Sequence, residues 1–100
     1  MVSAFASTWS KGNTQYGLKL TTSSGTATGT ISAYDNNVAV TVKVTLVYTV
    51  DYSYYSYLSN NSTGWQTAST TVNKNMSGMA PTSEKAYGTV AGSSVGSVGY

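Results

Sequence analysis

The chain of 100 residues contains no cysteine, no histidine and no arginine, and it carries only three carboxylates. Without cysteine there is no disulfide and no thiol nucleophile, and without histidine the serine-type catalytic triads and nearly all zinc sites are excluded. A small core that lacks disulfides needs another source of stability, and oligomerisation is one standard solution. We therefore expect no enzyme, no cofactor and no metal site, and we expect a homo-oligomer.

Charge is also scarce, since charged residues make up 8% of the chain and the net charge is +2. The polar residues are instead serine, threonine and asparagine, and such a surface stays hydrated while offering little for salt to screen. This composition predicts an extracellular, cell-surface or virion protein. The lysines are dispersed along the sequence and no arginine accompanies them, so we expect no nucleic-acid partner.

Long apolar runs are missing as well. No stretch approaches the roughly 18 apolar residues that a membrane-spanning helix needs, so we expect no transmembrane segment. No window repeats apolar residues at helical spacing, whereas β-branched and aromatic residues are frequent. Aromatic residues form 12% of the chain, and because each ring buries roughly 150–250 Å² they can supply a core that the few aliphatic residues cannot. The sequence predicts one folded, all-β domain covering residues 1–100.

The strongest pattern is VAVTVKVTLVYTVDYSYYSYL, residues 38–58, in which apolar and polar residues alternate. The alternation fits a single strand from Val38 to Tyr54, several times longer than the usual strand of roughly five or six residues. A straight strand of that length would extend out of a small domain. We therefore predict a bend between Thr49 and Ser53, with one half of the run in each of two packed sheets.

Shorter alternating segments predict the remaining strands: 15–21, 25–33, 65–73 and 86–91. The segment 74–83 contains the only proline and is predicted to be a loop, while the terminal segments 1–9 and 92–100 are predicted to be edge strands or strands exchanged with a neighbour. The fold class that follows is a single antiparallel β-sandwich or jelly-roll-like small barrel of about six to eight strands.

Two clusters of turn residues flank the long run, Tyr34–Asn37 before it and Asn60–Gly64 after it. Asparagine, aspartate and glycine tolerate left-handed backbone and favour reversals of the chain. These clusters predict that the long run forms one hairpin with 25–33 and another with 65–73. The middle of the protein is then a three-stranded antiparallel meander.

The three carboxylates are Asp35, Asp51 and Glu84. Hydrolysis by paired carboxylates needs two of them within roughly 5–9.5 Å in a cleft. Here one lies in a predicted turn, one at the predicted bend and one at the start of a predicted strand. We interpret them as turn residues and solvated strand ends rather than as catalytic groups.

Tyrosines on both faces of one segment make the only candidate site. Five tyrosines fall within ten residues, too many for one side of a small core, so some should be exposed. Three interpretations remain open: cross-strand aromatic pairs, a surface for self-assembly or another protein, and a platform for glycan binding. Trp65 is expected across the hairpin from the tyrosines, and Trp9 could dock onto a neighbouring molecule. The candidate interaction surface comprises Tyr52, Tyr54, Tyr55, Tyr57, Trp65 and Trp9.

Two functions fit these observations. One is a non-enzymatic structural protein that self-assembles in a surface layer, a fibre or filament, or a virion, through aromatic and strand-edge contacts. The other is a secreted monomeric binding module, or a bacteriocin-like effector, that engages a glycan or another cell-envelope component through its tyrosines and tryptophans. The same aromatic residues would serve either function, so the sequence leaves both open.

Overall fold

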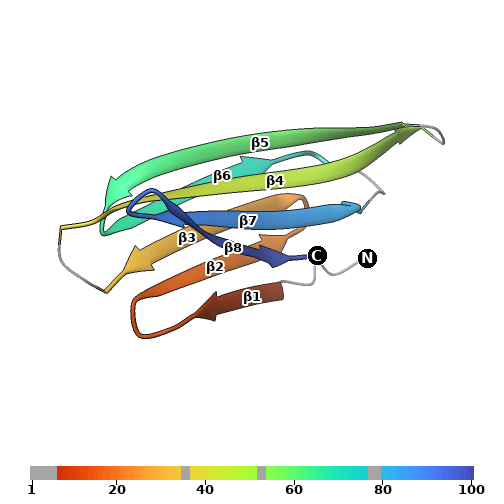
Figure 1. Cartoon of the computed structure of the whole chain (residues 1–100). Coiled ribbons are helices and arrows are strands. Elements are labelled where there is room, and N and C mark those ends of the chain that lie inside the picture. The colour runs from red at the N-terminus through yellow and green to blue at the C-terminus, as the bar shows by residue number, and fades with distance from the viewer. Residues whose placement is uncertain (1–6, 35–36, 52–53, 77–79) are drawn as a thin grey trace.

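The structure, a computed structural model, describes residues 7–34, 37–51, 54–76 and 80–100. These residues form eight strands and no helix, and the strands make two antiparallel sheets that pack face to face (Figure 1). The predicted all-β sandwich is therefore confirmed. The strands are β1 (Ser7–Gly12), β2 (Tyr16–Ser23), β3 (Thr26–Ala33), β4 (Ala39–Asp51), β5 (Tyr54–Trp65), β6 (Thr67–Asn73), β7 (Ser83–Val90) and β8 (Ser93–Gly99).

Each sheet has four strands. Sheet A has the order β1-β2-β3-β6 and sheet B the order β5-β4-β7-β8, with every neighbouring pair antiparallel. The strand edges of the sandwich are therefore β1 and β6 in one sheet and β5 and β8 in the other. No described strand pairs with the outer side of any of these four.

The core lies between the sheets because alternate residues of each strand point inward. Sheet B supplies four fully buried side chains from β4, and sheet A supplies leucines from β2 and an isoleucine from β3: Val40, Val42, Val44, Leu46, Leu18, Leu20 and Ile31. Gly29 of β3 faces this layer without a side chain. A Cβ at that position would lie 2.5 Å from a methyl group of Val44, so the glycine lets the two sheets approach closely.

Two tight turns connect hairpins within the sheets. Ser24 and Gly25 link β2 to β3 with φ angles of 48° and 84°, and Ala91 and Gly92 link β7 to β8 with φ angles of 50° and 83°. Positive φ at both central residues is the signature of a type I′ turn, whose twist matches that of the flanking strands. These turns set the registers of both hairpins.

The long alternating run is divided differently from the prediction. Instead of one strand bent across two sheets, it forms β4 and the start of β5, which pair antiparallel in sheet B, with Asp51 opposite Tyr54. The chain thus turns back within sheet B at the point where we expected it to cross into the other sheet. Val50 has no partner on β5, because the register shifts between Thr49 and Asp51, so β4 carries a β-bulge there and not a bend into the second sheet. Pairing the two halves with each other satisfies their main-chain groups within one sheet.

The predicted hairpin partners were also wrong. The segment after β3 leads from sheet A into sheet B, so β3 pairs with β2 and β6 and not with β4. Asn60–Gly64 lies inside β5, opposite Val40–Val44, and none of its residues has a positive φ. Asparagine and serine at an exposed sheet edge resemble turn residues in sequence, although here they only need to be polar. The three-stranded meander does not form.

The reversal after β5 is made by Gln66 alone, whose φ is 68°. This residue joins sheet B to sheet A in a single step. Its main-chain N–H donates to the carbonyl of Val38 at 2.8 Å, and its carbonyl accepts from the N–H of Ala33 at 2.7 Å. Ala33 ends β3 and Val38 precedes β4, so the two chain crossings at this end of the sandwich are bonded to one another.

Candidate functional site

Exposed tyrosines occur where β4 and β5 extend past the rest of sheet B. The neighbouring strand β7 pairs with β4 only from Val40 to Val47. Beyond that point β5 is the only strand neighbour of β4 among the described residues, and this hairpin reaches past the other strands (Figure 1). We call Tyr48–Asp51 and Tyr54–Ser56 the projecting end.

The projecting end carries apolar and aromatic surface in water. Tyr54, Tyr55 and Val50 are 61%, 67% and 58% exposed, and Tyr57, the next outward residue of β5, is 67% exposed. Large side chains that are open to this degree and adjacent in the fold are typical of interaction surfaces rather than of a monomer surface. Three predicted surface residues, Tyr54, Tyr55 and Tyr57, are therefore exposed within one short stretch of β5, with Tyr55 and Tyr57 on its outward face and Tyr54 on the opposite face.

Tyr48 differs from the other tyrosines because it faces inward and is half-buried. The amino group of Lys74 lies 4.9 Å from the centroid of its ring, a cation–π contact. The hydroxyls of Thr49 and Thr82 also bond at 3.1 Å, and the N–H of Thr82 donates to the carbonyl of Val47. The segment between β6 and β7 thus supports the root of the projecting end.

The structure does not place the two tryptophans with these tyrosines. Trp65 ends β5 at the opposite end of the strand, where it is 62% exposed and its indole N–H donates to the side-chain oxygen of Asn37 at 3.4 Å. The expected position across the hairpin from the tyrosines was wrong. Trp9 is half-buried in β1 and its ring lies 5.2 Å from that of Tyr100, so it contacts its own chain. Tyr52 lies outside the described residues.

The unpaired side of β5 is a second feature that the sequence did not reveal. This strand, YYSYLSNNSTGW, contains no charged residue and no proline, although both are common devices for protecting an edge. The other edges of the described sheets are shorter. In β1, Lys11 places a charge on the edge, and β8 is irregular, with positive φ at Gly96 and Gly99 and a register shift opposite it in β7. The edge of β5 is thus long, regular and uncharged.

The outer face of sheet A carries hydroxyl groups in place of aromatic rings. One row across its four strands consists of threonines, Thr8, Thr21, Thr28 and Thr71, which are consecutive partners in the sheet. The hydroxyls of Thr28 and Thr71 bond to each other at 2.9 Å. This regular polar surface explains how a protein with so few charges stays hydrated.

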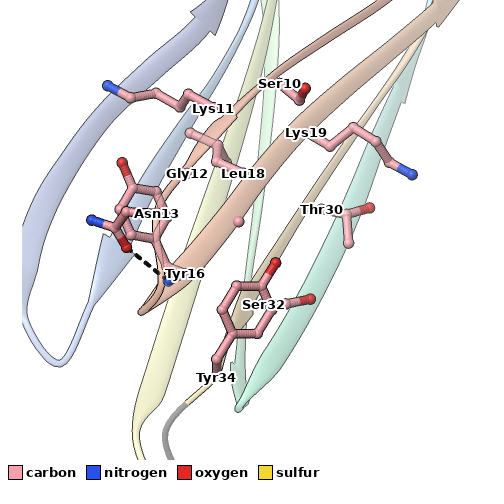
Figure 2. A pocket seen from close by; sticks show the side chains of 11 residues that line it. Ser10, Lys11, Gly12, Asn13, Tyr16, Leu18, Lys19, Thr30, Ser32 and Tyr34 are labelled. Carbon is pink, nitrogen blue, oxygen red and sulfur yellow. Dashed lines mark hydrogen bonds between the residues drawn. The ribbon is translucent and has the colours of Figure 1, made fainter.

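A shallow groove of about 510 Å³ lies at one end of this face, near the turn between β1 and β2 (Figure 2). The hydroxyl of Tyr34 lies over Gly17, where a Cβ would approach it to 2.7 Å. Lys11 and Lys19 border the groove but extend in different directions, so they do not converge on one point (Figure 2). The groove is lined by two tyrosines, Tyr16 and Tyr34, and by scattered hydroxyls, and it has no buried polar group directed into it among its described lining residues.

Glu84 was predicted to be a solvated strand end, and this prediction was wrong. Its side chain is only 3% exposed and points into the sandwich from β7, where Leu46 is its partner on β4. The hydroxyl of Tyr100 donates to Glu84 Oε1 at 2.6 Å, while Oε2 has no hydrogen-bond partner among the described residues. Burial raises the pKa of the Glu84 carboxyl from 4.5, and the hydrogen bond from Tyr100 offsets part of the rise.

The described residues contain no group of three or more histidine, cysteine, aspartate or glutamate side chains that could hold a metal ion. Asp35, one of the remaining carboxylates, lies outside the described residues. No helix long and apolar enough to cross a membrane occurs in the part of the chain that the structure describes. No protein-family model matches the sequence, and no curated protein or solved structure shows significant similarity to it.

Proposed function

We propose that the protein is a non-enzymatic structural subunit that associates with copies of itself through its exposed aromatic residues and open strand edges. The observation that carries this proposal is the projecting end, where Val50, Tyr54 and Tyr55 are each more than half exposed beside Tyr57. Exposed aromatic side chains contribute contact area at a low cost in side-chain entropy. The scarcity of charge supports the proposal, because copies at a net charge of +2 repel each other weakly.

A structural subunit of this composition belongs outside the cytoplasm, on a cell surface or in a virion. The surface polarity comes from hydroxyl and amide groups rather than from charges, and it is therefore insensitive to changes in ionic strength. The row of threonines on sheet A is the clearest case of such a surface. Assembly in that setting would persist as the salt concentration varies.

The experiment is to measure the mass of the full chain in solution over a wide concentration range by sedimentation, with electron microscopy of the concentrated sample. We expect particles larger than the monomer that grow with concentration. The triple variant Tyr54→Ser, Tyr55→Ser, Tyr57→Ser should need about tenfold or more higher concentration to associate, because it removes three exposed rings. The double variant Tyr34→Ser, Tyr87→Ser removes exposed rings elsewhere and should associate normally. A chain that stays monomeric throughout refutes the proposal.

A secreted monomeric module that binds a glycan or another cell-envelope component is the second candidate. The groove beside Tyr34 favours it, because a ring flanked by hydroxyls is suited to stacking and hydrogen bonding with a sugar. Titration of the monomer with neutral and acidic oligosaccharides tests this function. Binding that is lost in Tyr34→Ala and retained in Tyr87→Ala would support the module, and the absence of binding to any of them would refute it.

A further inference from the structure

We propose that two copies of the chain pair through the unpaired edges of β5, antiparallel and around a two-fold axis at Asn60, to form one continuous eight-stranded sheet. This inference rests on the proposed self-assembly and specifies its first contact. An open edge presents unsatisfied main-chain donors and acceptors in a row, so another strand can add to it directly. The edge of β5 spans Tyr54–Trp65 without a charge.

The partner we assign to this edge is the same edge of a second copy. Two-fold pairing needs only one kind of surface, which must be complementary to itself. The other edges are poorer partners. Lys11 lies on β1, and glycines with positive φ interrupt β8. The edge of β6 is partly occupied, because the side-chain amide of Asn60, on β5, donates to the main-chain carbonyl of Thr71 on β6 at 3.3 Å.

The faces of β5 restrict the possible registers. In an antiparallel pair, residues directly opposite each other point to the same face. On β5 the outward residues include Tyr55, Tyr57 and Trp65, which are partners of outward residues of β4, whereas Asn60 lies on the inward face with Leu58. A register that keeps both faces aligned therefore pairs odd-numbered residues with odd-numbered ones across the two-fold axis.

The aromatic residues then select the register. A two-fold axis at Asn60 places Tyr55 of each copy opposite Trp65 of the other, and it pairs the whole of Tyr55–Trp65. An axis at Asn61 would bring Tyr57 to Trp65 but leave Tyr55 without a partner. Both Tyr55 and Trp65 are more than 60% exposed in the single chain, and each ring buries roughly 150–250 Å² when it is covered. The dimer thus covers an exposed ring pair at each end of the new strand pair.

The middle of the proposed pair is polar and neutral. Ser59 of one copy lies opposite Asn61 of the other, and the two copies of Asn60 face each other across the axis. The chain has no cysteine, so an introduced thiol reports on a single position. Directly opposed residues have Cβ atoms roughly 4.5–5.5 Å apart and diagonal ones roughly 7–8 Å, while a disulfide needs about 3.5–4.5 Å.

The experiment introduces Ser59→Cys, Asn60→Cys and Asn61→Cys singly into the full chain and oxidises each at a concentration where the dimer forms. We expect Asn60→Cys to give a covalent dimer and the other two to give little alone. A mixture of Ser59→Cys with Asn61→Cys should give a cross-linked heterodimer. Ser97→Cys on β8 is the control and should stay uncross-linked, and circular dichroism verifies that each variant keeps its β structure.

A second set of variants tests the aromatic pairs without a thiol. Tyr55→Ser removes one ring from each end of the dimer and should weaken dimerisation by about tenfold or more. Tyr87→Ser removes a ring from the outer face of β7, away from the edge, and should leave dimerisation unchanged. Equal dimerisation of Tyr55→Ser and the unmodified chain would contradict the register.

The outcomes separate this inference from the proposed function. Efficient cross-linking of Ser59→Cys or Asn61→Cys alone would place the axis elsewhere and overturn the inference. Oligomers that form without cross-linking at any of the three positions would overturn it too, while leaving self-assembly intact. A β5-linked dimer that never grows further would support the inference and refute the structural subunit. A chain that stays monomeric would refute both.

Discussion

Along the β4–β5 hairpin, the part beside β7 and the part that projects beyond it have similar sequences and opposite environments. Leu46 and Val50 lie four residues apart in one strand, yet Leu46 is fully buried and Val50 is 58% exposed. Leu46 has partners on both β5 and β7, whereas Val50 sits in a bulge past the end of β7. Alternating apolar residues predict a strand, but their side chains are buried only where neighbouring strands run alongside that part of it.

The largest difference between the two parts should appear in their tolerance of truncated side chains. Leu46→Ala removes buried methyl groups and leaves a cavity, so we expect it to lower the free energy of unfolding by about 2–5 kcal/mol. Val50→Ala changes an exposed residue and should alter it by less than about 0.5 kcal/mol. Chemical denaturation of the monomer measures both. Similar losses for the two variants would mean that the projecting end is covered in solution.

A second contrast concerns the boundary between the two parts, where Glu84 lies opposite Leu46. The pKa of its carboxyl is raised in the folded state, so the folded chain binds the proton more tightly than the unfolded chain does. The stabilisation is fully present below about pH 4.5 and is lost as the pH rises through the folded-state value. We expect Glu84→Gln to flatten this part of the stability profile, measured by thermal unfolding between pH 4 and 8.

Tyr100→Phe sharpens the same test. It removes the hydrogen bond that lowers the pKa of Glu84, so the loss of stability should extend to higher pH than in the unmodified chain. Lys19→Met, a change of an exposed residue on sheet A, should keep the original profile. A profile of Glu84→Gln that matches the unmodified chain would show that this carboxyl does not govern the pH dependence.

The smallest effect is expected at the root of the projecting end. Lys74→Met removes the cation–π contact with Tyr48 and should cost about 0.5–1 kcal/mol. The same change at Lys19, which has no such ring contact among the described residues, should cost less. Hydrogen exchange of the Tyr48 and Thr49 amides provides the local readout. Faster exchange only in Lys74→Met would indicate that this lysine holds the projecting end against the sandwich.

The fold class was predictable because it depends on local patterns. Alternation in residues 15–21 and 25–33 and the absence of helical spacing depend only on neighbouring residues. Strand pairing was not predictable in the same way. Asn60–Gly64 has the composition of a turn, and only the positive φ of Gln66, two residues later, shows where the chain leaves the sheet.

The candidate site was predictable in part. The crowding of tyrosines predicted that some of them would be exposed, because a small core cannot accept rings from both faces of a strand, and Tyr54, Tyr55 and Tyr57 are exposed. Two features depend on residues far apart in sequence and had no local signal. The buried carboxyl of Glu84 accepts its hydrogen bond from Tyr100, which follows the end of β8, and β5 becomes an edge strand because β4 pairs with β7 on its other side.

The single-residue link at Gln66 has a mechanical consequence for an assembled subunit. A force applied to β5 by a neighbouring copy is transmitted directly to β6, in the opposite sheet, because only one residue separates the two strands. The hydrogen bonds of Gln66 to Ala33 and Val38 divide that load among the ends of four strands. Tension along the edge would therefore shear both sheets together instead of peeling one strand at a time.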